Sequence, residues 1–242
     1  MEALAALHAF SLRHPEWRSR ERLNVTQLMM IGGDNAGEKK SPEQAKSAHD
    51  HTIGLMKSKF PQYFPADLAD RLRDFTDLDQ HYDYATKVPA EMGVPSVLVH
   101  GDLWMANIFF RKDEQGNERL LAIVDWQVAH PGSFAEDMCR LLCSSVGSES
   151  RRQHTSELLR HYHAAFAKLG EKAPFTLEQV ERAYKRLFKF GALTIVPALP
   201  MAAMHDVMLG DKPDEARHEA LNRCKGLLED LCATEAGSVP WH

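Results

Sequence analysis

Hydrophobic positions recur at helical spacing from the start of the chain to about residue 95. The opening segment Met1–Phe10 is short and apolar, and it is predicted to be a helix. Ser41–Gln44 is a typical helix start, because serine can cap the first amide groups, proline fits the first turn and glutamine can complete a capping box. That helix is expected to run to Pro61, and another from about 66 to 84.

The pattern changes to short β-type runs in the middle of the chain. Val97–Val99 is the first run, a second begins at Asn107, and Leu120–Val124 is the third and ends at Asp125. The polar stretch Asp113–Glu118 between the last two runs is typical of a turn. The pattern therefore predicts a small sheet with one hairpin.

After the Pro131–Gly132 break the helical pattern returns. The expected helices cover about 134–146, 150–169, 176–190, 191–206 and 213–233. Thr176 and Gln179 stand at the spacing of a capping box. The apolar run Phe190–Met204 contains two prolines and is shorter than a bilayer requires, so we interpret it as a buried helix. The fold class predicted for the chain is α+β and mostly helical, with a small mid-chain β-hairpin.

Composition and charge narrow the class of protein. The chain has 242 residues, of which 44% are hydrophobic and 26% charged, as is usual for a globular protein. A net charge of −5 and a pI of about 6.2 disfavour a nucleic-acid-binding function. The sequence opens without the basic region and cleavage site of a secretory signal, and its four cysteines lack C-x-x-C spacing. We expect a cytoplasmic protein with no membrane or nucleic-acid partner.

One motif in the β-type region carries chemistry. Residues 100–107 have the pattern H-x-D-L-x-x-x-N, the spacing of a kinase catalytic loop, and Asp125 follows the next strands. A single Asp or Asn at a strand end is usually a turn residue, but this order and context favour a phosphoryl-transfer site. Asp102 is then the candidate base for an acceptor hydroxyl. The Asn107 amide and the Asp125 carboxylate are candidate Mg²⁺ ligands, because that ion prefers oxygen. His100 is expected to brace the loop through hydrogen bonds.

These residues resemble the choline-kinase-like and aminoglycoside-phosphotransferase-like kinases, which share the protein-kinase-like fold. The patterns that carry the resemblance are HGDLWxxNI at 100–108, DWQ at 125–127, PGS at 131–133 and AED at 135–137. They are most similar to the CHK-kinase-like group, which includes the ecdysteroid-kinase-like proteins of insects and many uncharacterised nematode proteins.

The resemblance implies a fold, a reaction and one further site residue. Residues 1–242 would form the helical C-lobe of a protein-kinase-like fold, with the catalytic loop and the metal-binding hairpin at 96–127. The implied reaction is transfer of the γ-phosphate of ATP, with Mg²⁺, to a hydroxyl of a small metabolite. Asp137 would brace the catalytic loop from the following helix, and a plain helix-start carboxylate is the alternative interpretation.

The ATP-binding elements of such a kinase are not recognisable in the sequence. In such a kinase the N-lobe carries a glycine-rich loop, a strand lysine and a helix glutamate. All three are expected before residue 1 here. We therefore expect the N-lobe to be absent, and its cofactor-binding residues are unknown. The glycine-rich stretch Gly32–Lys39 misses the phosphate-binding pattern, because Glu38 stands where lysine is needed. We interpret it as a solvated loop.

Three explanations of the short length remain open. The chain is a partial product of a longer kinase gene, or a natural short form that binds a ligand or partner without catalysis. Alternatively, another chain completes its site. The function alternative to small-molecule phosphorylation is therefore a non-catalytic binding module, a truncated pseudokinase.

Overall fold

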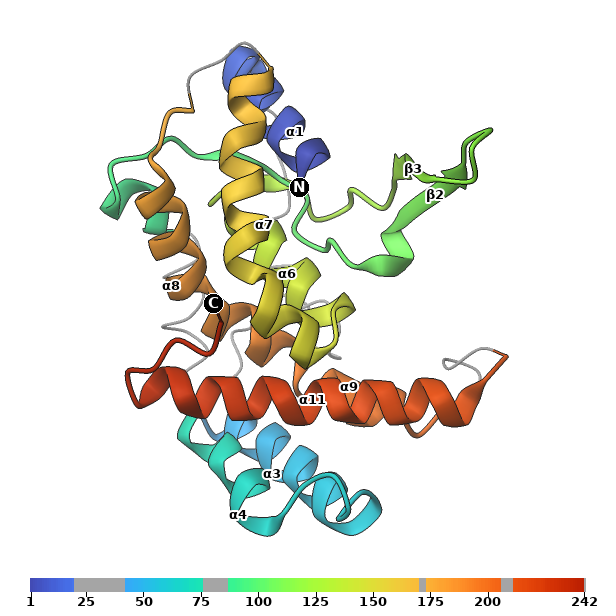
Figure 1. The fold of residues 1–242 in the computed structure, drawn as a ribbon. Helices are drawn as coiled ribbons and strands as arrows, with labels where there is room; N and C mark the ends of the chain where they lie inside the picture. Colours follow the sequence, from blue (N-terminus) through green and yellow to red (C-terminus); the bar gives the residue numbers. More distant parts are fainter. Residues whose placement is uncertain (20–41, 76–86, 170–172, 206–210, 242) are drawn as a thin grey trace.

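A computed structural model describes residues 1–19, 42–75, 87–169, 173–205 and 211–241 (Figure 1). The α-helices with defined bounds are α1 (Glu2–Arg13), α3 (Pro42–Lys59), α4 (Ala66–Asp70), α6 (Glu136–Ser145), α7 (Ser148–Lys168), α8 (Leu177–Ile195), α9 (Ala198–Ala202) and α11 (Pro213–Glu235). Short 3-10 helices are η1 (Pro15–Ser19), η2 (Arg71–Phe75) and η3 (Met105–Asn107). The strands are β1 (Val97–Val99), β2 (Ile108–Lys112), β3 (Glu118–Ile123) and β4 (His130–Gly132). The described part of the chain is thus mostly helical with short strands, an α+β fold.

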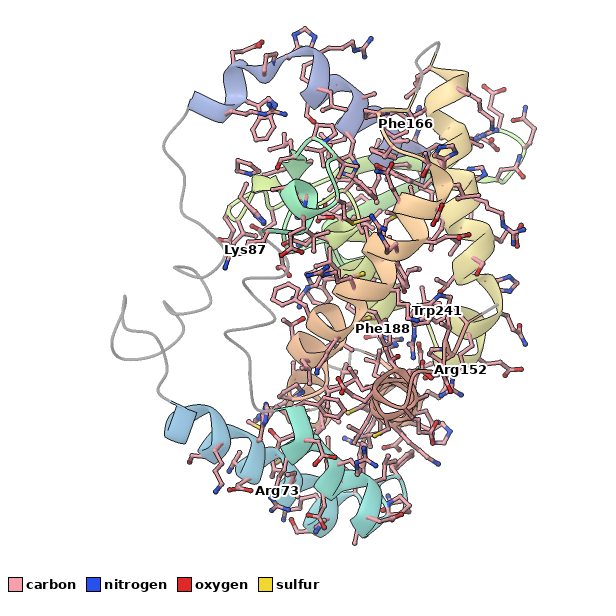
Figure 2. All side chains as sticks on the ribbon, turned by 90° about the vertical axis from the view of Figure 1, so that its left-hand side faces the viewer. Arg73, Lys87, Arg152, Phe166, Phe188 and Trp241 are labelled. Atoms are coloured by element: carbon pink, nitrogen blue, oxygen red, sulfur yellow. The ribbon has the colours of Figure 1, made fainter. Side chains whose placement is uncertain are left out.

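The helices are arranged around α11. Figures 1 and 2 show this helix running between the upper body, which contains α1, α6, α7 and α8, and the helices α3 and α4 below it. Within the upper body α6 packs along α8, and α1 packs against α7 and β1. Buried aromatic side chains fill the spaces between these helices. Phe134 stacks on Phe175 with ring centres 4.1 Å apart, and Trp241 packs on Phe188 at 4.9 Å (Figure 2).

Polar contacts made by Ser11 and His8 help attach α1 to the rest of the body. The hydroxyl of Ser11 accepts a hydrogen bond from the backbone N–H of Leu98 in β1 at 3.1 Å. The imidazole of His8 and the hydroxyl of Tyr162 in α7 share a hydrogen bond of 2.7 Å. Burial lowers the pKa of His8 to about 3, so this ring is neutral near physiological pH.

A buried ion pair joins α7 to α11. The Asp230 carboxylate accepts hydrogen bonds from Arg151 at 2.6 Å and from Arg152 at 2.7 Å. Asp230 and Arg151 are almost fully buried, whereas Arg152 is partly exposed and also contacts Glu229. Because both fully buried charges have partners here, the pair can lie in the core without an unpaired charge.

The strands form two separate two-stranded antiparallel sheets. In the first, β1 pairs with β4, and Val97 lies opposite Gly132. In the second, β2 pairs with β3 as the expected hairpin, with an irregular register between Phe109 and Phe110. The sequence pattern did not predict β4, because its proline and glycine are typical of a chain break, and the prediction of a single sheet was wrong. Proline is compatible with a strand at a sheet edge.

Helix predictions differ from the structure at two places. The segment expected to be one helix from residue 66 contains the short α4 followed by the 3-10 helix η2, and residues 76–86 lie outside the described residues. The break expected after residue 190 is absent, since α8 continues to Ile195. The single helix expected at 191–206 is wrong, because this segment contains the end of α8 and then the separate short helix α9. The capping box of Thr176 and Gln179 is confirmed, with hydrogen bonds of 3.2 and 2.8 Å. The expected cap at Ser41 and the loop Gly32–Lys39 lie outside the described residues.

The helices offer neither a metal site nor a membrane span in the part of the chain that the structure describes. Cys139 and Cys143 are buried on α6, as expected of small core residues. Among the described residues, no group of three or more His, Cys, Asp or Glu side chains is placed to hold a metal ion. In the same part of the chain, every helix is too short or too polar to cross a lipid bilayer.

Candidate active site

The loop with the kinase-like motif leaves β1 and passes very close to the segment before β4. Gly101 has a positive φ of 85°. A Cβ atom at this position would lie 2.7 Å from the carbonyl oxygen of Val128 and 3.2 Å from the ring of His130. Both the backbone conformation and the close approach therefore require glycine.

A buried carboxylate holds the beginning of this loop. The two oxygens of Asp137, in the first turn of α6, accept the backbone N–H groups of His100 at 2.7 Å and Gly101 at 2.9 Å. Burial raises the pKa of Asp137 to about 6; the two N–H donors oppose this increase and the nearby Glu136 adds to it. Asp137 thus contacts the backbone of the loop from the following helix.

His100 connects the loop to the end of the hairpin. Its ring is buried, with Nδ1 accepting the backbone N–H of Asp102 at 3.2 Å. We assign the proton to the other nitrogen, because Nε2 lies 2.8 Å from the carbonyl oxygen of Val124 and can then donate to it. The ring also packs against Trp126, with centres 4.6 Å apart. His100 therefore contacts both the candidate base segment and the candidate metal segment.

The carboxylate of Asp102 is partly exposed and is held through one oxygen. Its Oδ1 accepts hydrogen bonds from Nε and Nη2 of Arg140, at 3.1 and 2.6 Å. The other oxygen, Oδ2, receives no hydrogen bond from any residue that the structure describes. Nη1 of the same guanidinium donates to Thr194 on α8 at 3.1 Å. Sequence reasoning missed Arg140, although it stands three positions after Asp137 and so on the same side of α6.

Asn107 and Asp125 approach the loop from the two ends of the hairpin. The Asn107 amide nitrogen donates to the backbone carbonyl of Asp102 at 2.9 Å, and its Oδ1 accepts no hydrogen bond from the residues that the structure describes. The backbone carbonyl of Asn107 accepts the N–H of Val124 at 3.0 Å, so the next residue, Asp125, is brought to the same region. Asp125 is exposed and has a φ of 66°, a left-handed conformation that aspartate adopts more readily than most residues.

The structure therefore brings together the residues singled out by the sequence. Asp102 and Asn107 are in direct contact, and His100 and Asn107 both contact the residue that precedes Asp125. The oxygen atoms of this group fit a hard divalent cation that is held by one or two carboxylates and a bound phosphate, as Mg²⁺ commonly is. The roles of these residues stay predictions.

An ion pair lies directly behind the loop. Nε2 of His130 is 3.2 and 3.3 Å from the two carboxylate oxygens of Glu136, and Nδ1 is 2.8 Å from the carbonyl oxygen of Val128. Burial alone would lower the pKa of His130, but Glu136 and the Val128 carbonyl outweigh it and raise the pKa to about 9. The ring is therefore a charged imidazolium at neutral pH, in contact with the segment that Gly101 approaches.

The hairpin beside the loop exposes a large apolar surface. Figure 1 shows β2 and β3 projecting away from the helical body. The exposed apolar side chains on and next to the hairpin are Trp104, Met105, Phe109, Phe110, Leu120, Leu121, Val124 and Trp126. An isolated two-stranded hairpin is marginally stable in water, and exposed apolar patches usually mark contact with a ligand or another protein surface.

Two curated proteins of Caenorhabditis elegans are similar to this chain. The chain is 30% identical to the uncharacterized oxidoreductase dhs-27 over an alignment of 246 positions, which covers 86% of this chain and 28% of that protein. It is 29% identical over 181 aligned residues to the uncharacterized kinase-like protein D1044.1, covering 71% of this chain and 47% of that protein. The chain thus spans less than half the length of either relative. No solved structure matches it.

A family model matches almost the whole length of the chain, from residue 1 to 238. Its description, "Uncharacterized oxidoreductase dhs-27", is the name of the first relative. The match includes the loop with the kinase-like motif, the hairpin and the surrounding helices. The chain belongs to the DUF1679 family.

Proposed function

We propose that this chain carries the phosphoryl-transfer site of a small-molecule kinase that uses ATP and Mg²⁺. The observation that supports the proposal most is the hydrogen-bonded frame that brings Asp102, Asn107 and Asp125 into one region. The name of the kinase-like relative agrees with it. The oxidoreductase name receives no support from the sequence, because no two glycines have the G-x-G spacing of a dinucleotide-binding loop.

The proposed role of each residue follows from its free atoms. Asp102 is held through Oδ1, so Oδ2 is available to take the proton of the acceptor hydroxyl. The Asn107 amide is oriented by its nitrogen, and its free oxygen is suited to bind the cation together with the exposed carboxylate of Asp125. Bound Mg²⁺ neutralises phosphate charge during such a transfer. His100 and Asp137 hold the backbone on which these groups stand.

More specifically, we assign the chain to the CHK-kinase-like group, in which it would form the C-lobe of a protein-kinase-like fold. Gly101 replaces the arginine of protein kinases, and Trp126–Gln127 replaces Phe–Gly. Both differences favour a small-molecule acceptor over a protein. The close approach of Gly101 to Val128 supports this proposal, because a longer side chain has no space at that position.

Binding of Mg-ATP by the purified 242-residue chain tests the function. A ligand at 100 times its dissociation constant stabilises a folded protein by about 2.7 kcal/mol, so we expect a clear increase in melting temperature. Asp125→Ala should abolish the increase, whereas Glu114→Ala, which removes an exposed carboxylate in the hairpin turn, should not. Asp102→Asn should keep the increase and lower phosphate transfer to a panel of small alcohols by about 100-fold or more.

A second candidate function is a non-catalytic module that binds a ligand or partner. The exposed apolar side chains of the hairpin favour it, since they offer a contact surface beside a fully formed loop. A folded wild-type chain whose melting temperature is unchanged by Mg-ATP would contradict catalysis by this chain alone, and would support either this alternative or a partial chain that needs its N-lobe.

A further inference from the structure

Arg140 makes the most specific contact with the candidate base. Two nitrogens of its guanidinium, Nε and Nη2, donate to the same oxygen of Asp102. Both side chains are about three-quarters buried, so solvent screens this pair less than a surface ion pair. The geometry fixes the plane of the carboxylate and keeps its second oxygen free of donors from the described residues.

The guanidinium is in turn oriented by Thr194. The Thr194 hydroxyl donates its proton to the carbonyl oxygen of Gly191 at 2.8 Å, so the hydroxyl oxygen is left as an acceptor. Nη1 of Arg140 donates to that oxygen at 3.1 Å. The three donor nitrogens of the guanidinium are thereby divided between two acceptors on two different sides.

Close packing of α6 against α8 creates this arrangement. A Cβ atom at Gly191 would lie 3.0 Å from the Cβ of Cys139, so the helices approach closely at a position where α8 has no side chain. Arg140 follows Cys139, and Thr194 lies almost one helical turn after Gly191. The uninterrupted course of α8 past residue 191 is therefore necessary for the contact between Arg140 and Thr194.

We propose that Arg140, held by Thr194, is a positioning residue that fixes Asp102 with Oδ2 directed to the acceptor hydroxyl. The inference rests on the proposed phosphoryl transfer. In that reaction the hydroxyl proton passes to Oδ2, and the acceptor oxygen bonds to the γ-phosphorus. The bond from that phosphorus to the β–γ bridging oxygen breaks, and ADP leaves. Arg140 touches none of the reacting atoms and acts only through the carboxylate.

Phosphate release from Mg-ATP, with water as the acceptor, measures the effect without an identified metabolite. Arg140→Met should lower kcat by about tenfold or more, because small displacements of a reacting group are costly. Arg140→Lys should retain part of the rate, since lysine can donate once to Oδ1. Thr194→Val should also lower kcat, and Thr194→Ser should restore most of it. KM for Mg-ATP should change less than about twofold in all four variants, because Asp102 contacts the acceptor.

A double-mutant cycle separates positioning from a structural role. If Arg140 acts only through Asp102, then Arg140→Met should cause no further loss of kcat in an Asp102→Asn background. An additional tenfold loss in that background overturns the inference. So does a wild-type kcat in both Arg140→Met and Thr194→Val while Mg-ATP binds normally, a result that leaves the proposed function intact. A wild-type chain that neither binds Mg-ATP nor releases phosphate contradicts the proposed function for this chain on its own, and the inference with it.

Discussion

The ion pair of His130 and Glu136 behind the catalytic loop makes the stability of the protein depend on pH in a defined way. Both side chains are buried, and the imidazolium has acceptors at both nitrogens. Glu136→Gln keeps the size of the side chain and removes its charge. The substitution should therefore eliminate most of the stabilisation that the charged ring gains from this carboxylate, with little change in packing.

The magnitude follows from the pKa of His130. Burial opposes the charge of the ring, yet Glu136 and the Val128 carbonyl raise the pKa from 6.5 to about 9 in the folded protein. Because the folded state binds the proton more tightly, the contribution is fully present below pH 6.5 and is lost as the pH rises through 9. One pKa unit is worth about 1.4 kcal/mol, so the contribution is about 3 kcal/mol at pH 6.

Urea unfolding of the wild type and of Glu136→Gln at pH 6 and pH 9.5 measures the contribution. We expect the free energies of unfolding to differ by about 3 kcal/mol at pH 6 and by much less at pH 9.5. Glu114→Gln, an exposed carboxylate in the hairpin turn, is the matched control and should differ little from the wild type at either pH. An equal difference between wild type and Glu136→Gln at both pH values would refute the reasoning.

Two further substitutions test the packing around the site and between the helices. In urea unfolding, Gly101→Ala should lower the free energy of unfolding by about 2 kcal/mol more than Gly116→Ala. Both glycines have a similar positive φ, but only a Cβ at Gly101 would meet a carbonyl oxygen at 2.7 Å. Equal losses would contradict the close approach. Asp230→Ala should cost about 3–5 kcal/mol because it leaves Arg151 buried without its partner, whereas Glu229→Ala should cost less than about 1 kcal/mol. Similar melting temperatures for these two variants would contradict the stability cost assigned to the buried pair at Asp230.

The local sequence was sufficient to predict the arrangement where the contacts join residues that are close together in the chain. The loop that contains Asp102 and Asn107 is one short continuous segment, and the hairpin that leads from it to Asp125 is also short. The order and spacing of these residues along the chain are therefore enough to indicate a common region. Their chemical roles need the experiments above, because the same geometry is compatible with a module that has lost catalysis.

Contacts that depend on the crossing of distant elements were not predictable in this way. Arg140 meets Thr194 only because α6 and α8 pack closely at Gly191, where the sequence pattern predicts a boundary between two helices. Strand β4 was missed for a similar reason. It has few strand-forming residues and exists because β1 lies beside it. In both places the tertiary partner, and not the local preference, determines the structure.

The attachment of α1 has a consequence for the order of folding during synthesis. His8 is 154 positions from Tyr162, the residue that shares its hydrogen bond. At ribosomal rates of about 5–20 residues per second, the partner is made roughly 8–30 s later. A helix of 12 residues is too short to be stable alone, so α1 has no lasting native packing in that interval. We therefore expect α1, although it is synthesised before α7, to reach its native packing only after α7 has left the ribosome.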